Sequence, residues 1–147
     1  MATSRTSPIG TTLTCSNFYN SGSIAYKPAR MYYNKYGSTN FWWSQNTPSE
    51  SSPVWMQFEL DIPQSIKVFF ISNGGRSNVF VKRIQMVAGN SEDSLEPITD
   101  ILSLETTVYW SMVFGNKYHP GKVYKYYRLN VIEGQGGVSI SDFLMYN

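Results

Sequence analysis

Few side chains in this sequence could do acid–base or nucleophilic chemistry. His119 is the one histidine and Cys15 the one cysteine among the 147 residues. A Ser-His-Asp or Cys-His arrangement would have to use His119, which precedes Pro120 and Gly121 in what we interpret as an exposed loop. Nothing in the order of residues brings a nucleophile to it. The sequence therefore does not favour nucleophilic catalysis.

Paired carboxylates are the second kind of catalytic group to consider, because two acids on either side of a glycosidic bond carry out glycoside hydrolysis. Glu92 and Asp93 are adjacent in a polar turn, where solvation explains them, and Glu59 and Asp61 stand at the end of one expected strand. Zinc sites need three or four His or Cys ligands, and no such cluster is present. The glycine-rich segment 134–137 precedes a strand, so it lacks the helix N-terminus that binds phosphate. We predict that the protein is not an enzyme.

Composition and charge limit the remaining classes of function. Aromatic residues make up 16% of the chain and charged residues 15%, whereas about a quarter of the residues in an ordinary globular domain are charged. Such a chain buries many rings or presents them to a ligand. The net charge is only +2, and Lys and Arg are scattered without a basic run. We therefore predict no nucleic-acid partner.

The N-terminus and the cysteine count indicate the cellular compartment. Residues 1–8 (Met-Ala-Thr-Ser-Arg-Thr-Ser-Pro) are polar and lack the apolar segment of a secretory signal peptide. No window of the sequence reaches the roughly 18 apolar residues of a membrane span. We expect a protein that is made in the cytosol and has no membrane span. Cys15 has no partner for an intramolecular disulfide, and we expect it to be an inert buried thiol.

Period-two alternation and turn residues dominate the chain, and this pattern predicts an all-β fold. We expect strands at residues 13–17, 41–44, 54–60, 65–72, 79–87, 106–114, 122–131 and 138–145. Eight antiparallel strands fit a jelly-roll β-sandwich. We expect a single domain over residues 1–147, in which residues 1–12 form an N-terminal arm. Only residues 94–104 hint at a helical turn.

Alternation also sorts side chains between the two faces of each expected strand. The inner face should hold Met56, Phe58, Leu60, Tyr127, Leu129 and Val131, and the outer face Trp55, Gln57, Glu59, Tyr126, Arg128 and Asn130. Residues 68–71 (Val-Phe-Phe-Ile) are all apolar. They predict a strand covered on both sides, which is either a central strand or an edge that meets a partner.

Several motifs occur in a suggestive order. They are residues 14–17 (Thr-Cys-Ser-Asn), 28–34 (Pro-Ala-Arg-Met-Tyr-Tyr-Asn), 41–44 (Phe-Trp-Trp-Ser), 55–60 (Trp-Met-Gln-Phe-Glu-Leu), 124–131 (Tyr-Lys-Tyr-Tyr-Arg-Leu-Asn-Val) and 140–146 (Ile-Ser-Asp-Phe-Leu-Met-Tyr). Their order and spacing resemble the discoidin, or coagulation factor 5/8 C-type, domain of the galactose-binding-like superfamily. The resemblance covers roughly residues 13–146. It implies a galactose-binding-like sandwich that binds a ligand.

The resemblance also implies a candidate calcium site. In that family the ion is often held by backbone carbonyls of an early loop together with a late acidic residue. The positions that match are Asn34, Gly37, Ser38 and Asp142. Asn34 and Lys35 stand where the family prefers Asp-Gly, and Asp142 stands where glutamate is usual. With one carboxylate instead of two, we expect calcium to bind more weakly.

Sugar recognition combines an aromatic face with planar polar groups that bind paired hydroxyls. The resemblance aligns Trp42 with a packed position, so alternation turns Trp43 outward as a candidate platform, with a buried structural ring as the alternative. The resemblance places the loop 72–78, with Asn73 and Arg76, at the ligand end of the sandwich. An ordinary solvated hairpin is the alternative for that loop.

Two further groups of aromatic residues are candidates for ligand contacts. Tyr36 lies in the loop where the family puts much of its ligand surface, and Trp110, Tyr118 and His119 could form a second aromatic cluster. The sequence does not decide which end of the sandwich binds. The candidate ligand-binding residues are therefore Tyr36, Trp43, Asn73, Arg76, Trp110 and His119.

We expect a non-catalytic binding module for a glycan or polysaccharide, acting as an accessory, decoration or tail component of a phage or virus particle. The expected setting rests on the lack of a secretory signal, linker or partner domain, which would be unusual for a secreted lectin. One alternative is a purely structural virion protein with no glycan ligand, buried against other virion proteins. Another is a glycoside-processing enzyme. A homo-oligomer is also left open.

Overall fold

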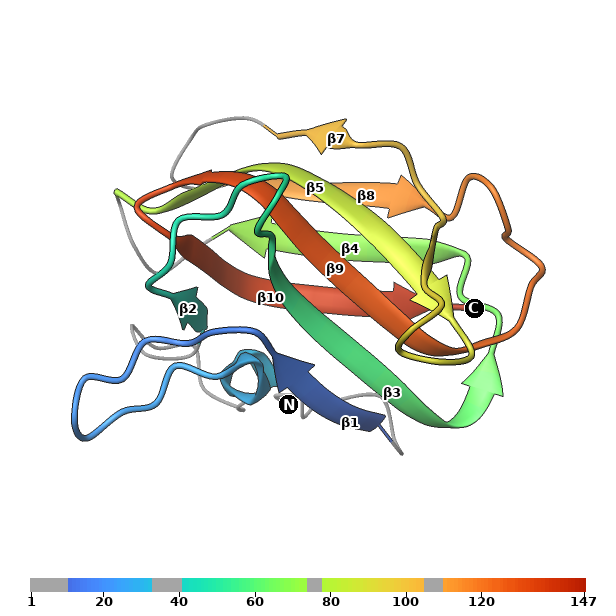
Figure 1. The fold of residues 1–147 in the computed structure, drawn as a ribbon, viewed down its shortest axis with the longest axis horizontal. Helices are drawn as coiled ribbons and strands as arrows, with labels where there is room; N and C mark the ends of the chain where they lie inside the picture. Colours follow the sequence, from blue (N-terminus) through green and yellow to red (C-terminus); the bar gives the residue numbers. More distant parts are fainter. Residues whose placement is uncertain (1–10, 33–40, 74–77, 105–109) are drawn as a thin grey trace, which may run out of the picture.

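The computed structural model describes residues 11–32, 41–73, 78–104 and 110–147, which form two packed antiparallel sheets (Figure 1). The six-stranded sheet has the order β1-β3-β9-β5-β6, and β7 also pairs with β5. Its strands are β1 (Thr11–Cys15), β3 (Val54–Gln64), β9 (Tyr124–Gln135), β5 (Phe80–Gly89), β6 (Glu96–Pro97) and β7 (Leu102–Ser103). The four-stranded sheet has the order β2-β10-β4-β8. Its strands are β2 (Trp42–Ser44), β10 (Val138–Tyr146), β4 (Val68–Asn73) and β8 (Ser111–Gly115).

This architecture confirms the predicted all-β sandwich. The short 3-10 helix η1 (Pro28–Tyr32) is the one helix in the described ranges. No helix in them is long and apolar enough to cross a membrane.

The core lies between the two sheets and confirms the predicted inner face. The six residues assigned to that face on β3 and β9 are all buried, and so is Trp42. Aromatic rings join the sheets, since Phe58 on β3 stacks on Phe143 of β10 with 5.5 Å between ring centroids. Phe69 of β4 stacks on Phe114 of β8 at 5.3 Å. Strand β4 is central, between β10 and β8, which is one of the two alternatives left open for the apolar run at residues 68–71. Its outer side is not covered as predicted, because Val68 is 37% exposed.

A buried tyrosine fixes the connection between β3 and β4, where the chain passes from one sheet to the other. The Tyr127 hydroxyl donates a hydrogen bond to the Gln64 carbonyl oxygen at 2.7 Å and accepts one from the Ile66 backbone N–H at 2.9 Å. Tyr127 is fully buried, and burial raises the pKa of its phenol. The phenol therefore stays protonated, bonds the Gln64 carbonyl, and satisfies the Ile66 N–H, which would otherwise be buried without a partner.

The chain passes back between the sheets at a tight turn, Gly136 and Gly137, which joins β9 to β10. Their φ angles are 68° and 110°, in the region that residues with a side chain rarely adopt. A Cβ atom on Gly137 would also overlap the carbonyl oxygen of Ser44 on β2. Glycine is therefore required at position 137 by both the turn and the approach of the neighbouring strand.

The segment 94–104 contains no helical turn, so that prediction was wrong. Its residues instead form β6 and β7, which both pair with the edge of β5. Ile98 is fully buried, its backbone N–H donates to the Met86 carbonyl at 2.9 Å, and the Thr99 hydroxyl accepts from the Met86 N–H at 3.0 Å. Hydrogen bonding to the exposed edge of β5 outweighs the weak local preference of this segment for a helix.

Other boundaries also differ from the prediction, and β3, for example, continues to Gln64 instead of ending at residue 60. Thr11 and Thr12 belong to β1 rather than to an arm, because they pair with Leu60 and Glu59. Residues 65–67 form the crossover between sheets, so β4 begins only at Val68. Of the strand predicted at 106–114, residues 106–109 lie outside the described residues, and β8 covers Ser111–Gly115. Strand β9 continues to Gln135 because it stays paired with Phe80 of β5. The helix η1 had no counterpart in the prediction.

Removing the Tyr127 hydroxyl should destabilise the fold. We expect Tyr127→Phe to lower the free energy of unfolding by about 1–3 kcal/mol, because the buried Ile66 N–H loses its acceptor. Equilibrium unfolding in urea measures this loss. Tyr126→Phe is the matched control: its partly exposed hydroxyl donates only to Glu59, at 3.3 Å, and we expect a change below about 0.5 kcal/mol. Equal losses in the two variants would contradict the role given to Tyr127.

The turn between β9 and β10 gives a second prediction. We expect Gly137→Ala to cost at least about 2 kcal/mol, since it adds both backbone strain and overlap with the Ser44 carbonyl. Gly121→Ala is the control, because a Cβ there meets nothing within 4 Å. Thermal unfolding of the two variants side by side tests the prediction. An unchanged melting temperature for Gly137→Ala would show that the turn is not a constraint.

Candidate functional site

The connections between strands gather at two ends of the sandwich (Figure 1). We call one the Gly136 end, which holds the segments 16–26, 45–53 and 136–137. We call the other the His119 end, which holds the segments 65–67, 90–95 and 116–123. The strand registers fix this division. Asn73 pairs with Ile140 at the Gly136 end, and Val68 pairs with Tyr146 at the other.

The residues predicted to bind a ligand divide between these ends. Trp43 on β2, Asn73 at the end of β4 and Trp110 just before β8 lie at the Gly136 end. His119 lies at the opposite end, so the predicted cluster of Trp110 with His119 does not form. Tyr36 and Arg76 fall outside the described residues, as do the candidate calcium ligands Asn34, Gly37 and Ser38.

The two tryptophans at the Gly136 end do not form one platform. Strands β2 and β8 are the two edges of the four-stranded sheet, so Trp43 and Trp110 start from opposite sides of it. The Trp43 ring packs against Tyr19, with 3.9 Å between centroids, and meets Tyr26 edge-on at 5.4 Å. Trp110 is only 8% exposed and belongs to the core cluster. Little of either ring is left for a ligand to cover.

A single amide side chain, that of Asn17, organises the Gly136 end. Its Oδ1 accepts hydrogen bonds from the Ser44 hydroxyl at 3.0 Å and from the backbone N–H groups of Gln45 and Asn46 at 3.1 and 3.3 Å. Its backbone carbonyl accepts from the Trp42 indole at 3.0 Å. The motif 14–17 therefore ties the end of β1 to the start of the segment 45–53.

A groove of about 480 Å³ opens beside Asn17. It is lined by Ser16, Asn17, Asn46, Thr47, Ser52, Pro53 and Val54. These side chains carry amides and hydroxyls and no formal charge. The Asn46 and Thr47 side chains are exposed and make no hydrogen bond to other described residues. The groove therefore presents neutral donors and acceptors on a backbone that Asn17 holds in place.

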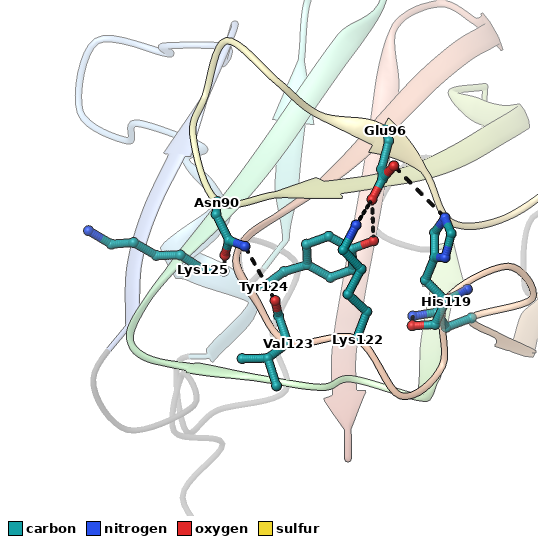
Figure 2. A network of polar contacts seen from close by, with 8 residues as sticks. Asn90, Glu96, His119, Lys122, Val123, Tyr124 and Lys125 are labelled. Carbon is teal, nitrogen blue, oxygen red and sulfur yellow. Dashed lines mark hydrogen bonds and ion pairs between the residues drawn. The ribbon is translucent and has the colours of Figure 1, made fainter.

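The His119 end is closed by ionic contacts centred on Glu96 (Figure 2). Glu96 Oε1 accepts hydrogen bonds from Lys122 Nζ and from the Tyr124 hydroxyl, both at 2.6 Å, and His119 Nε2 lies 3.9 Å from Oε2. The bonds from Lys122 and Tyr124 lower the pKa of Glu96. Burial, followed by the bond to Glu96, raises the pKa of Tyr124. Glu96 is thus an ionised acceptor and Tyr124 a protonated donor.

The rest of the segment 116–123 is fastened in the same way. Asp100 accepts hydrogen bonds from Lys117 Nζ at 2.6 Å and from the Tyr118 hydroxyl. The buried Asn116 amide donates to the carbonyls of Ile66 and His119, at 3.0 and 2.9 Å. The sequence did not reveal these pairs, because Glu96 and Asp100 stand about twenty residues from the lysines that they bind. These ion pairs give Glu96, Asp100 and the two lysines a structural role.

The described residues do not assemble a catalytic or metal-binding constellation. Cys15 lies at the end of β1, near the Gly136 end, while His119 lies at the other end, so the two cannot pair. Burial also raises the pKa of Cys15. No group of three or more His, Cys, Asp or Glu side chains comes together within the described residues. Asp142 Oδ2 accepts from the Ser72 hydroxyl at 2.9 Å on the outer side of β10, and calcium at Asp142 stays a prediction.

Comparison with known proteins shows relatives of this fold. No protein-family model and no curated protein sequence matches the chain. Among solved structures, a CBM32 carbohydrate-binding module from Clostridium perfringens in complex with GalNAc-β-1,3-galactose has a TM-score of 0.72 at 12% identity, covering 93% of this chain and 95% of that one. An F5/8 type C domain from Bacteroides fragilis has a TM-score of 0.68 at 15% identity, over 93% and 91%.

An enzyme also contains this fold. A structure of allantoicase has a TM-score of 0.68 at 10% identity, over 93% of this chain and 40% of that one. The likeness to the CBM32 module and the F5/8 type C domain spans nearly the whole length of each. The chain therefore has the discoidin-like, galactose-binding-like β-sandwich fold that its motifs resemble.

Proposed function

We propose that the protein is a non-catalytic carbohydrate-binding module whose ligand site lies at the Gly136 end. The observation that carries this proposal is the uncharged groove beside Asn17, on a fold shared over nearly its full length with a module solved with a bound disaccharide. Amides and hydroxyls on a fixed backbone suit the paired hydroxyl groups of a neutral sugar. The His119 end fits this role less well, since its carboxylates already bind lysine and tyrosine.

The structure supports the ligand-binding candidates from sequence at this end to different degrees. Trp43 contributes through the edge of a ring that Tyr19 already covers. Tyr36 and Arg76 remain predictions from sequence, as does the contribution of the Asn73 side chain. The groove residues Asn46, Thr47 and Ser52 are the contacts that the geometry favours, and they were not among the candidates from sequence.

The setting that we propose is a phage or virus particle, in which the module is an accessory, decoration or tail component. One observation supports burial against neighbouring proteins. The outer side of the four-stranded sheet presents an apolar area in which Val113 is 66%, Tyr146 51% and Val68 37% exposed. Phe70 and Leu144 lie between them, because Phe70 pairs with both Leu144 and Val113. The same surface also supports the second candidate, a purely structural assembly protein.

A glycan array with matched variants tests the binding proposal. We expect the folded protein to bind at least one neutral glycan, and Asn46→Ala or Thr47→Ala to weaken that binding about 5- to 10-fold, the value of roughly one hydrogen bond. Gln64→Ala removes an exposed amide at the His119 end and should leave binding unchanged. Arg76→Ala belongs in the same series as a test of the sequence prediction.

Three outcomes would count against the proposal. Silence of the array from a folded protein would favour the assembly protein, whose presence an antibody raised against the chain would reveal in purified particles. If Gln64→Ala weakened glycan binding as much as Asn46→Ala does, the ligand site would not be at the Gly136 end. Hydrolysis of any bound glycan, followed by chromatography, would instead support the glycoside-processing alternative.

A further inference from the structure

The outer side of the six-stranded sheet carries a second set of polar and aromatic residues, none of which lines the groove. The strand registers place them in two neighbouring rows across β3, β9 and β5. One row is Trp55, Asn130 and Gln85, and the other is Gln57, Arg128 and Val87. Figure 1 shows the middle of β9 facing the viewer, between the segment 45–53 and the connection from β5 to β6. Trp55, Gln85, Arg128 and Asn130 are partly exposed on this side of the sheet, whereas Gln57 and Val87 are buried.

Arg128 is held rigidly at the centre of this surface. Its guanidinium carbon lies 4.2 Å from the centroid of the Trp55 ring, a cation–π contact. Its Nε donates to Gln57 Oε1 at 2.8 Å, and Gln57 is itself only 2% exposed. Gln57 Nε2 in turn donates to Glu92 Oε1 at 2.9 Å. Two contacts thus fix the plane of the guanidinium without using its terminal nitrogens.

The terminal nitrogens of Arg128 have no partner among the described residues, neither a hydrogen bond nor a carboxylate within ion-pair distance. Arg83, on the same sheet, provides a contrast. Its Nη2 lies 2.9 Å from Glu50 and its Nη1 lies 3.5 Å from Glu133. A half-buried arginine whose fork is held in place but not engaged is suited to bind a carboxylate through two parallel hydrogen bonds.

Asn130 supplies neutral hydrogen-bonding groups beside this fork. Its side chain makes no hydrogen bond to the described residues, and it follows Arg128 by two positions on the same side of β9. That spacing is about 7 Å along a strand, roughly the width of a pyranose ring with its substituents. Gln85 next to it donates to the Thr99 carbonyl at 3.3 Å, which leaves its own amide oxygen as an acceptor.

We infer that this surface binds an acidic sugar, with the carboxylate of a hexuronic acid residue on the Nη1 and Nη2 groups of Arg128 and ring hydroxyls on Asn130 and Gln85. The site is separate from the groove at the Gly136 end and does not rest on the function proposed for it. Glu92 is the carboxylate whose charge acts on Arg128, and Gln57 links the two side chains. Burial lowers the pKa of Arg128 and Glu92 raises it, so Glu92 favours the charged guanidinium but opposes the binding of an anionic ligand.

Isothermal titration calorimetry with tetragalacturonate, its methyl ester and acetate tests this inference. We expect tetragalacturonate to bind at least tenfold more tightly than either the uncharged ester or acetate. Arg128→Lys keeps the charge but loses the fork, and should weaken binding about tenfold or more. Asn130→Ala should weaken it about 3- to 10-fold. Glu92→Gln keeps an acceptor for Gln57 and removes the opposing charge, so it should strengthen binding about threefold.

Asn130→Ala and Glu92→Gln keep the test decisive if Arg128→Lys fails to fold, since neither removes a contact that holds the core. Equal affinity for the acid and its ester would overturn the inference, and so would acetate binding as tightly as the oligomer. Uronate binding that Asn46→Ala abolishes and Asn130→Ala does not would also overturn it while leaving the proposed function intact. Uronate binding that is weakened by Arg128→Lys and Asn130→Ala but unchanged by Asn46→Ala would support this inference, whether or not the groove at the Gly136 end binds a neutral glycan.

Discussion

The turn at Gly136 and Gly137 is the constraint on which the sandwich depends. Strands β9 and β10 follow one another in sequence but belong to different sheets, so two residues must carry the chain across the core. They do so with positive φ angles, and the turn brings Gly137 against the Ser44 carbonyl. Val138 then pairs with Ser44, which sets the position of β2. Because Asn17 holds both Ser44 and the segment after it, the groove depends on the same turn.

The backbone polar groups are satisfied differently at the two ends of the sandwich, and this difference is the reason to propose the ligand site at the Gly136 end. At the His119 end, Asn116 saturates the backbone of its own segment, and each carboxylate that faces the segment holds a lysine and a tyrosine. A ligand there would have to break those pairs. At the Gly136 end, Asn17 accepts hydrogen bonds from the backbone N–H groups of Gln45 and Asn46, and the side chains of Asn46 and Thr47 stay exposed. Polar groups that are fixed but not engaged lose little entropy when they bind.

Much of the fold could be predicted from the sequence, because alternation reports directly which side chains are buried. The faces of β3 and β9 follow from that rule, whereas the apolar run of β4 left a central strand and an edge as alternatives. The helix η1 and strands β6 and β7 could not be predicted, since short elements form in response to an edge already in place. The same limit applies to the site. Trp43 points away from the core as alternation requires, but only the structure shows that Tyr19 covers its ring.

Arg83 and Arg128 show why the fold alone cannot assign a ligand. Both lie on the six-stranded sheet, on strands that pair with one another, and alternation gives no reason to treat them differently. The difference arises from side chains far away in the sequence: Glu50 reaches Arg83 from the segment 45–53, whereas Glu92 reaches only Gln57. A likeness of about 12% identity to modules with bound sugars preserves the backbone on which such contacts are built, not the contacts themselves. We therefore expect the specificity of the proposed sites to depend on the few polar groups that have no partner among the described residues.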